Sequence, residues 1–74
     1  MKDTEILAAF SQRVKELRLK KGLTQQELAE QAEVEYKYIQ RIEGKNPPSI
    51  GILKLVKLLK ALDVSFARFF DFLK

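Results

Sequence analysis

The sequence predicts an all-α protein, a compact bundle of five helices in a single domain. Apolar residues recur at spacings of three and four, and no segment alternates apolar and polar residues with a period of two. The two prolines, Pro47 and Pro48, are adjacent, so they interrupt the helical pattern at one place only. A chain of 74 residues with 46% hydrophobic and 32% charged residues has the size and composition of one globular domain, here residues 1–74.

The first helix is expected at about residues 4–21. Four apolar residues spaced by four, four and three form one stripe along it: Ile6, Phe10, Val14 and Leu17. Asp3 or Thr4 can cap its start, and Gly22 can end it in the left-handed conformation that closes many helices.

The second and third helices are short and close together. The second opens with TQQE, a capping box in which Thr24 and Glu27 each accept a hydrogen bond from the backbone N–H of the other. Its narrow apolar face consists of Leu28, Ala29 and Ala32. The pattern breaks at Glu33, and the third helix is expected at about residues 35–43. Two short helices joined by a tight turn pack crosswise, so the outer face of the third should protrude.

The last two helices follow the loop GKNPPS. The fourth is expected to place one apolar face on the core: Ile52, Leu55, Val56, Leu59 and Leu62. Either Ser49 or Gly51 can cap its start. The last helix, at about residues 65–73 with Ser65 as its cap, should have an apolar face made of Phe66, Phe69, Phe70 and Leu73. Phe72 lies off that face, so we expect it to be partly exposed.

The third helix has a polar side and an apolar side. With a rotation of about 100° per residue, Ile39 and Ile42 define the buried side, and Lys37 and Arg41 fall almost opposite to them. Gln40 and Tyr36 occupy one shoulder of the helix, and Tyr38 the other. This pattern is compatible with an ordinary solvated surface. It is also compatible with a helix that lies in the major groove of DNA, which is roughly 12 Å wide.

Residues 13–64 resemble the Xre/Cro/CI helix-turn-helix domain, which has the lambda-repressor-like fold. The five predicted helices occur in the family order. Small or apolar residues stand at the family's packing positions within the helix-turn-helix, about residues 24–43: Leu28, Ala29, Ala32, Val34, Ile39 and Ile42. The resemblance implies a sequence-specific transcriptional regulator that binds double-stranded DNA and reads it through the major groove with helix 35–43.

The resemblance also implies roles for particular residues. Gln25 and Gln26 open the second helix, and both are expected to contact DNA. Gln25 matches a glutamine that touches a phosphate and can brace a side chain of the recognition helix. Positions that meet base edges or nearby backbone are matched by Tyr36, Lys37, Gln40 and Arg41. Positions that hold the sugar-phosphate strand from the following loop are matched by Lys45 and Asn46. Arg18 and Glu43 match a pair that forms a structural salt bridge.

Three features depart from the family pattern. Glu33 stands where the family has a turn glycine, and a positive φ there would cost about 1 kcal/mol. Glu35 stands at the cap position of the third helix, where Ser or Thr is usual. The two carboxylates either point away from the DNA, or Glu35 accepts a hydrogen bond from a cytosine amino group. The loop EGKNPPS is one residue shorter than the commonest family version.

Two copies of the domain are expected to act together. One such module buries about 600–1,000 Å² on DNA, which is small for tight specific binding. Two copies about 34 Å apart would read the two halves of a palindromic operator. We place the interface of this homodimer on the last helix, at Phe69, Phe72 and Leu73.

The composition narrows the function further. The chain has neither His nor Cys, which removes catalytic triads and the usual zinc sites, and no glycine-rich phosphate loop occurs. We therefore expect a cytoplasmic protein that is not an enzyme and has no cofactor, metal, small-molecule ligand or membrane segment. A net charge of +4 suits a polyanionic partner. The alternatives are an antitoxin or a restriction–modification controller that binds DNA in the same way, and a protein-interaction adaptor that uses the Phe-rich last helix.

Overall fold

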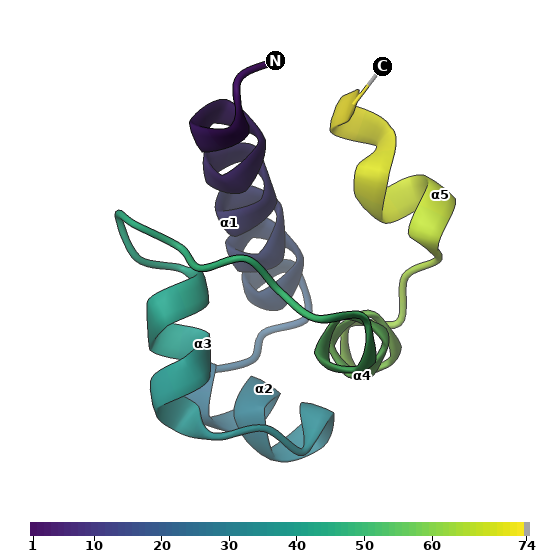
Figure 1. Cartoon of the computed structure of the whole chain (residues 1–74). Coiled ribbons are helices and arrows are strands. Elements are labelled where there is room, and N and C mark those ends of the chain that lie inside the picture. The colour runs from purple at the N-terminus through teal and green to yellow at the C-terminus, as the bar shows by residue number, and fades with distance from the viewer. Residues whose placement is uncertain (74) are drawn as a thin grey trace.

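The computed structural model describes residues 1–73, which form five α-helices and one 3₁₀-helix and contain no strand (Figure 1). The elements are α1 (Asp3–Lys20), α2 (Gln25–Ala32), α3 (Tyr36–Ile42), α4 (Ile52–Leu62), α5 (Phe66–Phe69) and the 3₁₀-helix η1 (Phe70–Leu73). The predicted fold class is confirmed.

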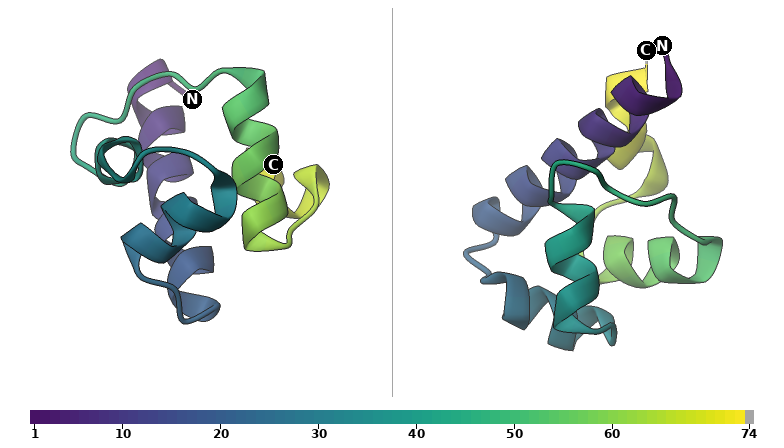
Figure 2. Two further views of the ribbon diagram at one scale, coloured as in Figure 1. Left: turned by 90° about the horizontal axis from the view of Figure 1, so that it is seen from below. Right: turned by 60° about the vertical axis from the view of Figure 1, so that its left-hand side comes forward.

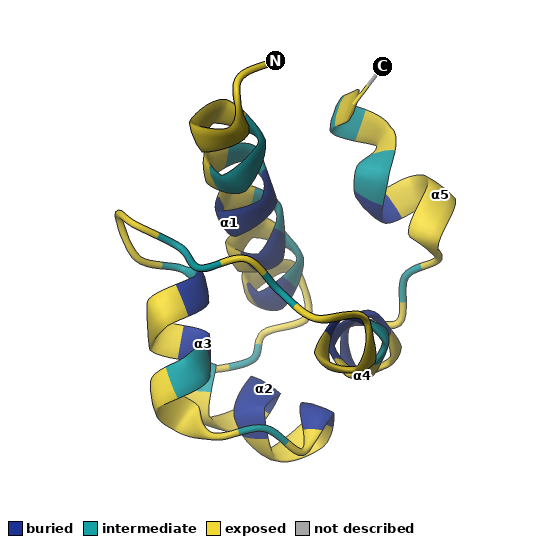
Figure 3. Cartoon of the chain, in the orientation of Figure 1, coloured by how far each residue is buried: buried dark blue, intermediate teal, exposed yellow. Residues whose placement is uncertain are grey.

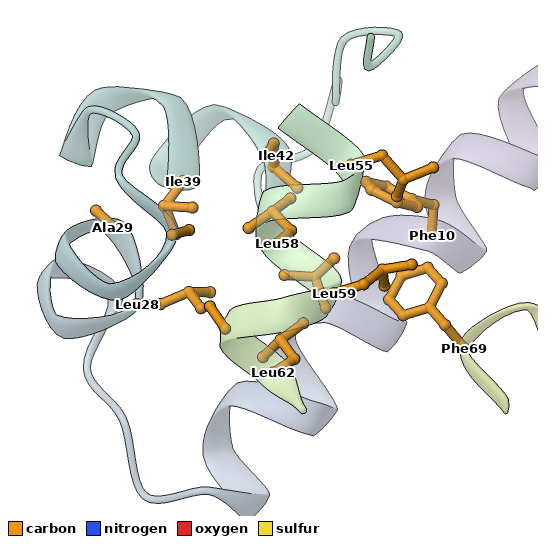
Figure 4. Packing of buried hydrophobic residues seen from close by; sticks show 13 residues of the cluster. Phe10, Leu28, Ala29, Ile39, Ile42, Leu55, Leu58, Leu59, Leu62 and Phe69 are labelled. Atoms are coloured by element: carbon orange, nitrogen blue, oxygen red, sulfur yellow. The ribbon is translucent and has the colours of Figure 1, made fainter. Parts of the chain in front are cut away.

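The helices surround one core. α2 packs against both α3 and α4, and η1 packs against α1. The N-terminal half of α1 and the η1 segment lie on the side of the molecule opposite to α2 (Figures 1 and 2). The core consists of Phe10, Val14, Leu28, Ala29, Ala32, Ile39, Ile42, Leu55, Leu58, Leu59, Ala61, Leu62 and Phe69 (Figure 4). Because residues from all five α-helices share this core, α3 is anchored by the whole molecule.

Three helices end in the same way. Gly22, Glu33 and Asp63 follow α1, α2 and α4, and all three have positive φ, of 72°, 57° and 55°. The next residue in each case is apolar and packs on the core, and its N–H donates back to the helix, as Val34 does to the carbonyl of Ala29 over 3.0 Å. This closure satisfies the last carbonyls and turns the chain sharply toward the next helix. Glu33 therefore has the strained, positive φ that we considered for this position, where the family has glycine.

The starts of the helices confirm two predictions and correct one. In the capping box of α2, the Thr24 hydroxyl accepts from the N–H of Glu27 over 3.0 Å, and the Glu27 carboxylate accepts from the N–H of Thr24 over 2.8 Å. Ser65 caps α5 by accepting from the N–H of Arg68. The cap of α1 is Lys2 rather than Asp3 or Thr4, because the Glu5 carboxylate reaches back to accept from the Lys2 N–H over 2.9 Å.

The buried face of α4 differs from the predicted one. Gly51 precedes the helix, and the buried face includes Leu58 and Ala61, whereas Ile52 is 64% exposed. The first turn of α4 extends past the other helices to the edge of the molecule (right-hand view of Figure 2), so Ile52 has no neighbouring helix to cover it. The periodicity identified the helix, but the position of its neighbours decided which turns are buried.

The last helix is shorter than predicted and changes type. After four residues α5 gives way to η1, whose turn contains three residues rather than 3.6. This tighter winding brings Phe72 over Phe69, with ring centroids 6.2 Å apart, and leaves Leu73 exposed. Phe72 is half-buried, Phe66 is 47% exposed, and Phe69 is fully buried against Phe10. The predicted apolar face of Phe66, Phe69, Phe70 and Leu73 was therefore wrong at both of its ends.

Candidate nucleic-acid interface

The outer side of α3 is exposed over its length, as the helical pattern predicted (Figure 3). Ile39 and Ile42 are fully buried and hold the helix to the core. The exposed residues on the other side are Tyr36, Lys37, Gln40 and Arg41. Lys37 and Arg41 are thus directed into solvent rather than against the protein's own body.

The turn between α2 and α3 makes α3 protrude. The left-handed Glu33 reverses the chain, and Val34 packs on the core immediately after it. Glu35 then begins α3 in an extended conformation, without a side-chain cap. Ala29, which is almost fully buried, lies where the two helices meet, and a small residue there allows the helices to approach closely (Figure 4). As a result α2 buttresses the inner side of α3 and leaves the outer side free.

The predicted salt bridge between Arg18 and Glu43 is present and buried. The Nε and Nη2 atoms of Arg18 donate to the two carboxylate oxygens of Glu43 over 2.8 and 2.9 Å. The side chains are only 9% and 3% exposed. Arg18 also donates to the carbonyl of Leu23 over 2.8 Å. The hydrogen bond to Glu43 raises the pKa of Arg18, and burial opposes this rise. The pair ties α1 to the end of α3 and to the start of α2.

The glutamines at the start of α2 lie in different surroundings. Gln26 is exposed, whereas Gln25 is half-buried and its Nε2 donates to Glu43 Oε1 over 3.1 Å. Gln25 is therefore joined to the Arg18–Glu43 pair. The family resemblance implied that Gln25 can brace a side chain of the recognition helix, but residues 18 positions apart give no local sequence signal that this side chain is Glu43.

The loop after α3 adds two exposed polar residues, Lys45 and Asn46. They follow Gly44, the residue after Glu43, so this loop begins at the C-terminal end of α3 (Figure 1). Gly44 begins this loop, and a Cβ atom there would come within 3.2 Å of the Gln40 carbonyl. A side chain at this position would push the loop away from the helix.

The shoulder of α3 that carries Tyr38 is mixed in charge. A shallow depression there is lined by Glu33, Val34, Glu35, Tyr38, Lys54 and Lys57. The ammonium group of Lys54 lies 4.1 Å from the centroid of the Tyr38 ring. Burial raises the pKa of Tyr38, and the charge of Arg41 lowers it. The two carboxylates thus lie beside the lysines of α4, on the shoulder opposite to Gln40, which favours the alternative that they point away from DNA.

Comparisons with known proteins agree with this geometry. A helix-turn-helix family model matches residues 14–69. The chain belongs to the helix-turn-helix family of the Xre/Cro/CI type. None of the curated proteins matches the chain.

Solved structures of restriction–modification controller proteins are similar to this chain. The wild-type controller C.Esp1396I is 34% identical with a TM-score of 0.82, and the match covers 99% of this chain and 91% of that one. C.Esp1396I bound to a 19-base-pair DNA duplex is 37% identical with a TM-score of 0.81, covering 90% and 88%. The controller C.AhdI from Aeromonas hydrophila is 33% identical with a TM-score of 0.76, covering 82% and 91%.

Neither a metal site nor a membrane helix emerges from residues 1–73. No group of three acidic, His or Cys side chains lies close enough to hold a metal ion within this part of the chain. None of its helices is long and apolar enough to cross a membrane.

Proposed function

We propose that this chain is a sequence-specific transcriptional regulator that binds double-stranded DNA by placing α3 in the major groove. The observation that carries the proposal is the exposed row of Lys37, Gln40 and Arg41 on a helix whose other side is fully buried. An α-helix with its side chains is about 10–12 Å in diameter, so α3 can enter a major groove that is roughly 12 Å wide. The chain acts as a binding protein rather than an enzyme, and because its partner is DNA we place it in the cytoplasm.

The exposed side chains divide the work of recognition. Arg41 and Lys37 can donate to guanine O6 and N7, and Gln40 can pair with adenine N6 and N7. Tyr36 is 44% exposed, with its hydroxyl available to bases or backbone. The phosphates that flank the contacted bases are held by two pairs of residues. These are Gln25 and Gln26 at the start of α2, and Lys45 and Asn46 in the loop after α3.

Restriction–modification control is the regulatory role that the comparisons favour. The similar structures are controller proteins, and one of them is bound to a DNA duplex. An antitoxin would use the same surface, and the genes beside this one distinguish the two roles. The adaptor alternative loses its basis, because the phenylalanines of the last helix mainly fill the protein's own core.

The DNA proposal is tested by selecting duplexes from a random pool and measuring affinity by fluorescence anisotropy. Arg41→Ala and Lys37→Ala should each weaken binding to the enriched duplex about 5- to 150-fold, the value of one good base contact. Arg68→Ala is the matched control, because Arg68 is exposed on α5, which lies on the far side of α4 from α3 (Figure 1). If no duplex is enriched, or if all three variants bind alike, the proposal is wrong.

The regulator acts as a homodimer, and the structure favours a different interface from the C-terminal one predicted. Phe69 is fully buried in its own chain and has no surface to offer a partner. Ile52 and Leu53 are 64% and 77% exposed in the first turn of α4. This turn is the end of α4 that lies at the outer edge of the molecule when the outer side of α3 comes forward (right-hand view of Figure 2). A two-fold contact between two such edges leaves both α3 helices facing one side of the DNA.

Sedimentation distinguishes the two interfaces. Leu53→Glu should convert the dimer to monomer, because it places like charges against each other across the two-fold axis. Leu19→Glu, an equally drastic change at an exposed residue of α1, should leave the dimer intact. A dimer that survives Leu53→Glu but dissociates with Leu73→Glu would restore the interface predicted from the sequence.

A further inference from the structure

The side chain of Glu43 is shared between a buried arginine and a glutamine of the proposed DNA-binding surface. Its Oε2 accepts from Arg18 Nε over 2.8 Å, and its Oε1 accepts from both Arg18 Nη2 and Gln25 Nε2, over 2.9 and 3.1 Å. Arg18 is itself fixed by the Leu23 carbonyl at 2.8 Å. The carboxylate of Glu43 is therefore held at both oxygens before Gln25 adds its own hydrogen bond.

The chemistry of this contact fixes the orientation of the Gln25 amide. An ionised carboxylate only accepts hydrogen bonds, so the amide nitrogen of Gln25, and not its oxygen, must face Glu43. One N–H of Nε2 is used by Glu43, and the second N–H remains available to another acceptor. Gln25 is half-buried at the first residue of α2, so this N–H lies near the surface.

The charge balance suits a phosphate at that place. A carboxylate close to DNA repels the phosphate backbone, but the side chain of Glu43 is 3% exposed and paired with Arg18 through two hydrogen bonds. A phosphate therefore approaches the neutral amide of Gln25 rather than a free negative charge. A side chain that is already ordered loses less entropy on binding, and this effect is typically about 2- to 12-fold in affinity for one long side chain.

We propose that Glu43 is a positioning residue for DNA binding: neutralised by Arg18, it holds Gln25 with one amide N–H ready for a phosphate. This inference rests on the proposed function, and it adds to the role of Arg18 and Glu43 as a structural pair. It also separates Gln25 from the adjacent Gln26, which is exposed.

The direction in which one substitution changes the affinity for DNA tests the proposal. Glu43→Gln removes a negative charge next to DNA, so simple electrostatics predicts tighter binding and a changed salt dependence. Positioning predicts the reverse: affinity for the enriched duplex falls about 2- to 12-fold, and the salt dependence is unchanged because the lost contact is neutral.

A double-mutant cycle supplies the second readout. With Gln25→Ala already present, Glu43→Gln should have no further effect on affinity, whereas with Gln26→Ala it should keep its full effect. If Glu43→Gln lowers affinity equally in all backgrounds, Glu43 acts only through the fold and the proposal is wrong. Circular dichroism on each variant establishes that the fold is kept.

Nuclear magnetic resonance tests the positioning step in the unaltered protein, should Glu43→Gln unfold it. The side-chain amide protons of Gln25 should exchange with solvent more slowly than those of Gln26, in the absence of DNA. Equal exchange would overturn the positioning role, whatever the protein binds. If Gln25 is ordered but no duplex is bound, the proposed function fails together with the phosphate contact.

Discussion

The two sides of α3 are held by different kinds of interaction. At its C-terminal end, Glu43 joins Arg18 and Gln25 in a buried group whose side chains are fixed by several hydrogen bonds. On the other shoulder, Tyr38 meets Lys54 by one cation–π contact at a partly open depression. The same helix thus has several buried hydrogen bonds at its C-terminal end and a single cation–π contact at the Tyr38 shoulder.

The difference shows which end of α3 carries the buried polar contacts. The buried group joins the end of α3 to α1 and to the start of α2, and it also holds Gln25, a residue of the proposed interface. The Tyr38 side includes Glu33, whose left-handed backbone is strained for a residue with a side chain. The strained residue and the open depression thus lie together on the shoulder that has no buried polar group.

The largest effect is expected from breaking the buried pair. Arg18→Ala leaves the carboxylate of Glu43 buried without its partner, and such a change typically costs about 3–5 kcal/mol. Urea unfolding followed by circular dichroism would measure this loss in the free energy of unfolding. The double change Arg18→Met with Glu43→Leu should be far less destabilising, since no unpaired charge remains. A loss below about 1 kcal/mol for Arg18→Ala would show that the Arg18–Glu43 pair stabilises the fold no more than an exposed salt bridge does.

A smaller effect of opposite sign is expected at the turn. Glu33→Gly should raise the free energy of unfolding by about 1 kcal/mol, because glycine adopts a φ of 57° without strain. Asp63→Gly is the matched control at a φ of 55°, and it should gain less because aspartate tolerates this region better than glutamate. Equal gains at both positions would show that aspartate tolerates a positive φ here no better than glutamate, and would contradict this prediction. Thermal unfolding of the three proteins makes the comparison.

The contact between Lys54 and Tyr38 should contribute least to stability. Lys54→Met keeps the length of the side chain and removes the charge, and it should cost about 0.5–1 kcal/mol, the range for exposed cation–π pairs. In a Tyr38→Leu background the same change should have no effect. A cost as large as that of Arg18→Ala would erase the contrast between the two sides of α3.

The ionisation of Tyr38 reports how closed this side is. Burial raises its pKa above the ordinary value of 10.0. The folded state therefore favours the protonated phenol, so this contribution to stability is fully present below the ordinary pKa and is lost as the pH rises from there through the raised pKa of the folded state. Absorbance titration of the Tyr36→Phe variant observes Tyr38 alone. Arg41→Ala should raise the pKa further, because the positive charge of Arg41 lowers it.

The sequence by itself determined the helices, most of their caps and the outward side of α3. These follow from periodicity and from residues a few positions apart, such as Thr24 with Glu27, whose interaction is local. The resemblance to a known family added the pairing of Arg18 with Glu43, which the structure contains.

Only the tertiary structure decided which apolar residues stay exposed and which polar groups are linked. Ile52 has the helical spacing of a core residue, yet no helix covers the first turn of α4. Phe72 is partly exposed as expected, but the change to a 3₁₀ turn places its ring against Phe69, which the helical spacing did not predict. Gln25 contacts Glu43 because α2 packs against α3. These exposures and contacts depend on how elements distant in sequence pack together. The spacing of residues within one helix does not indicate that packing.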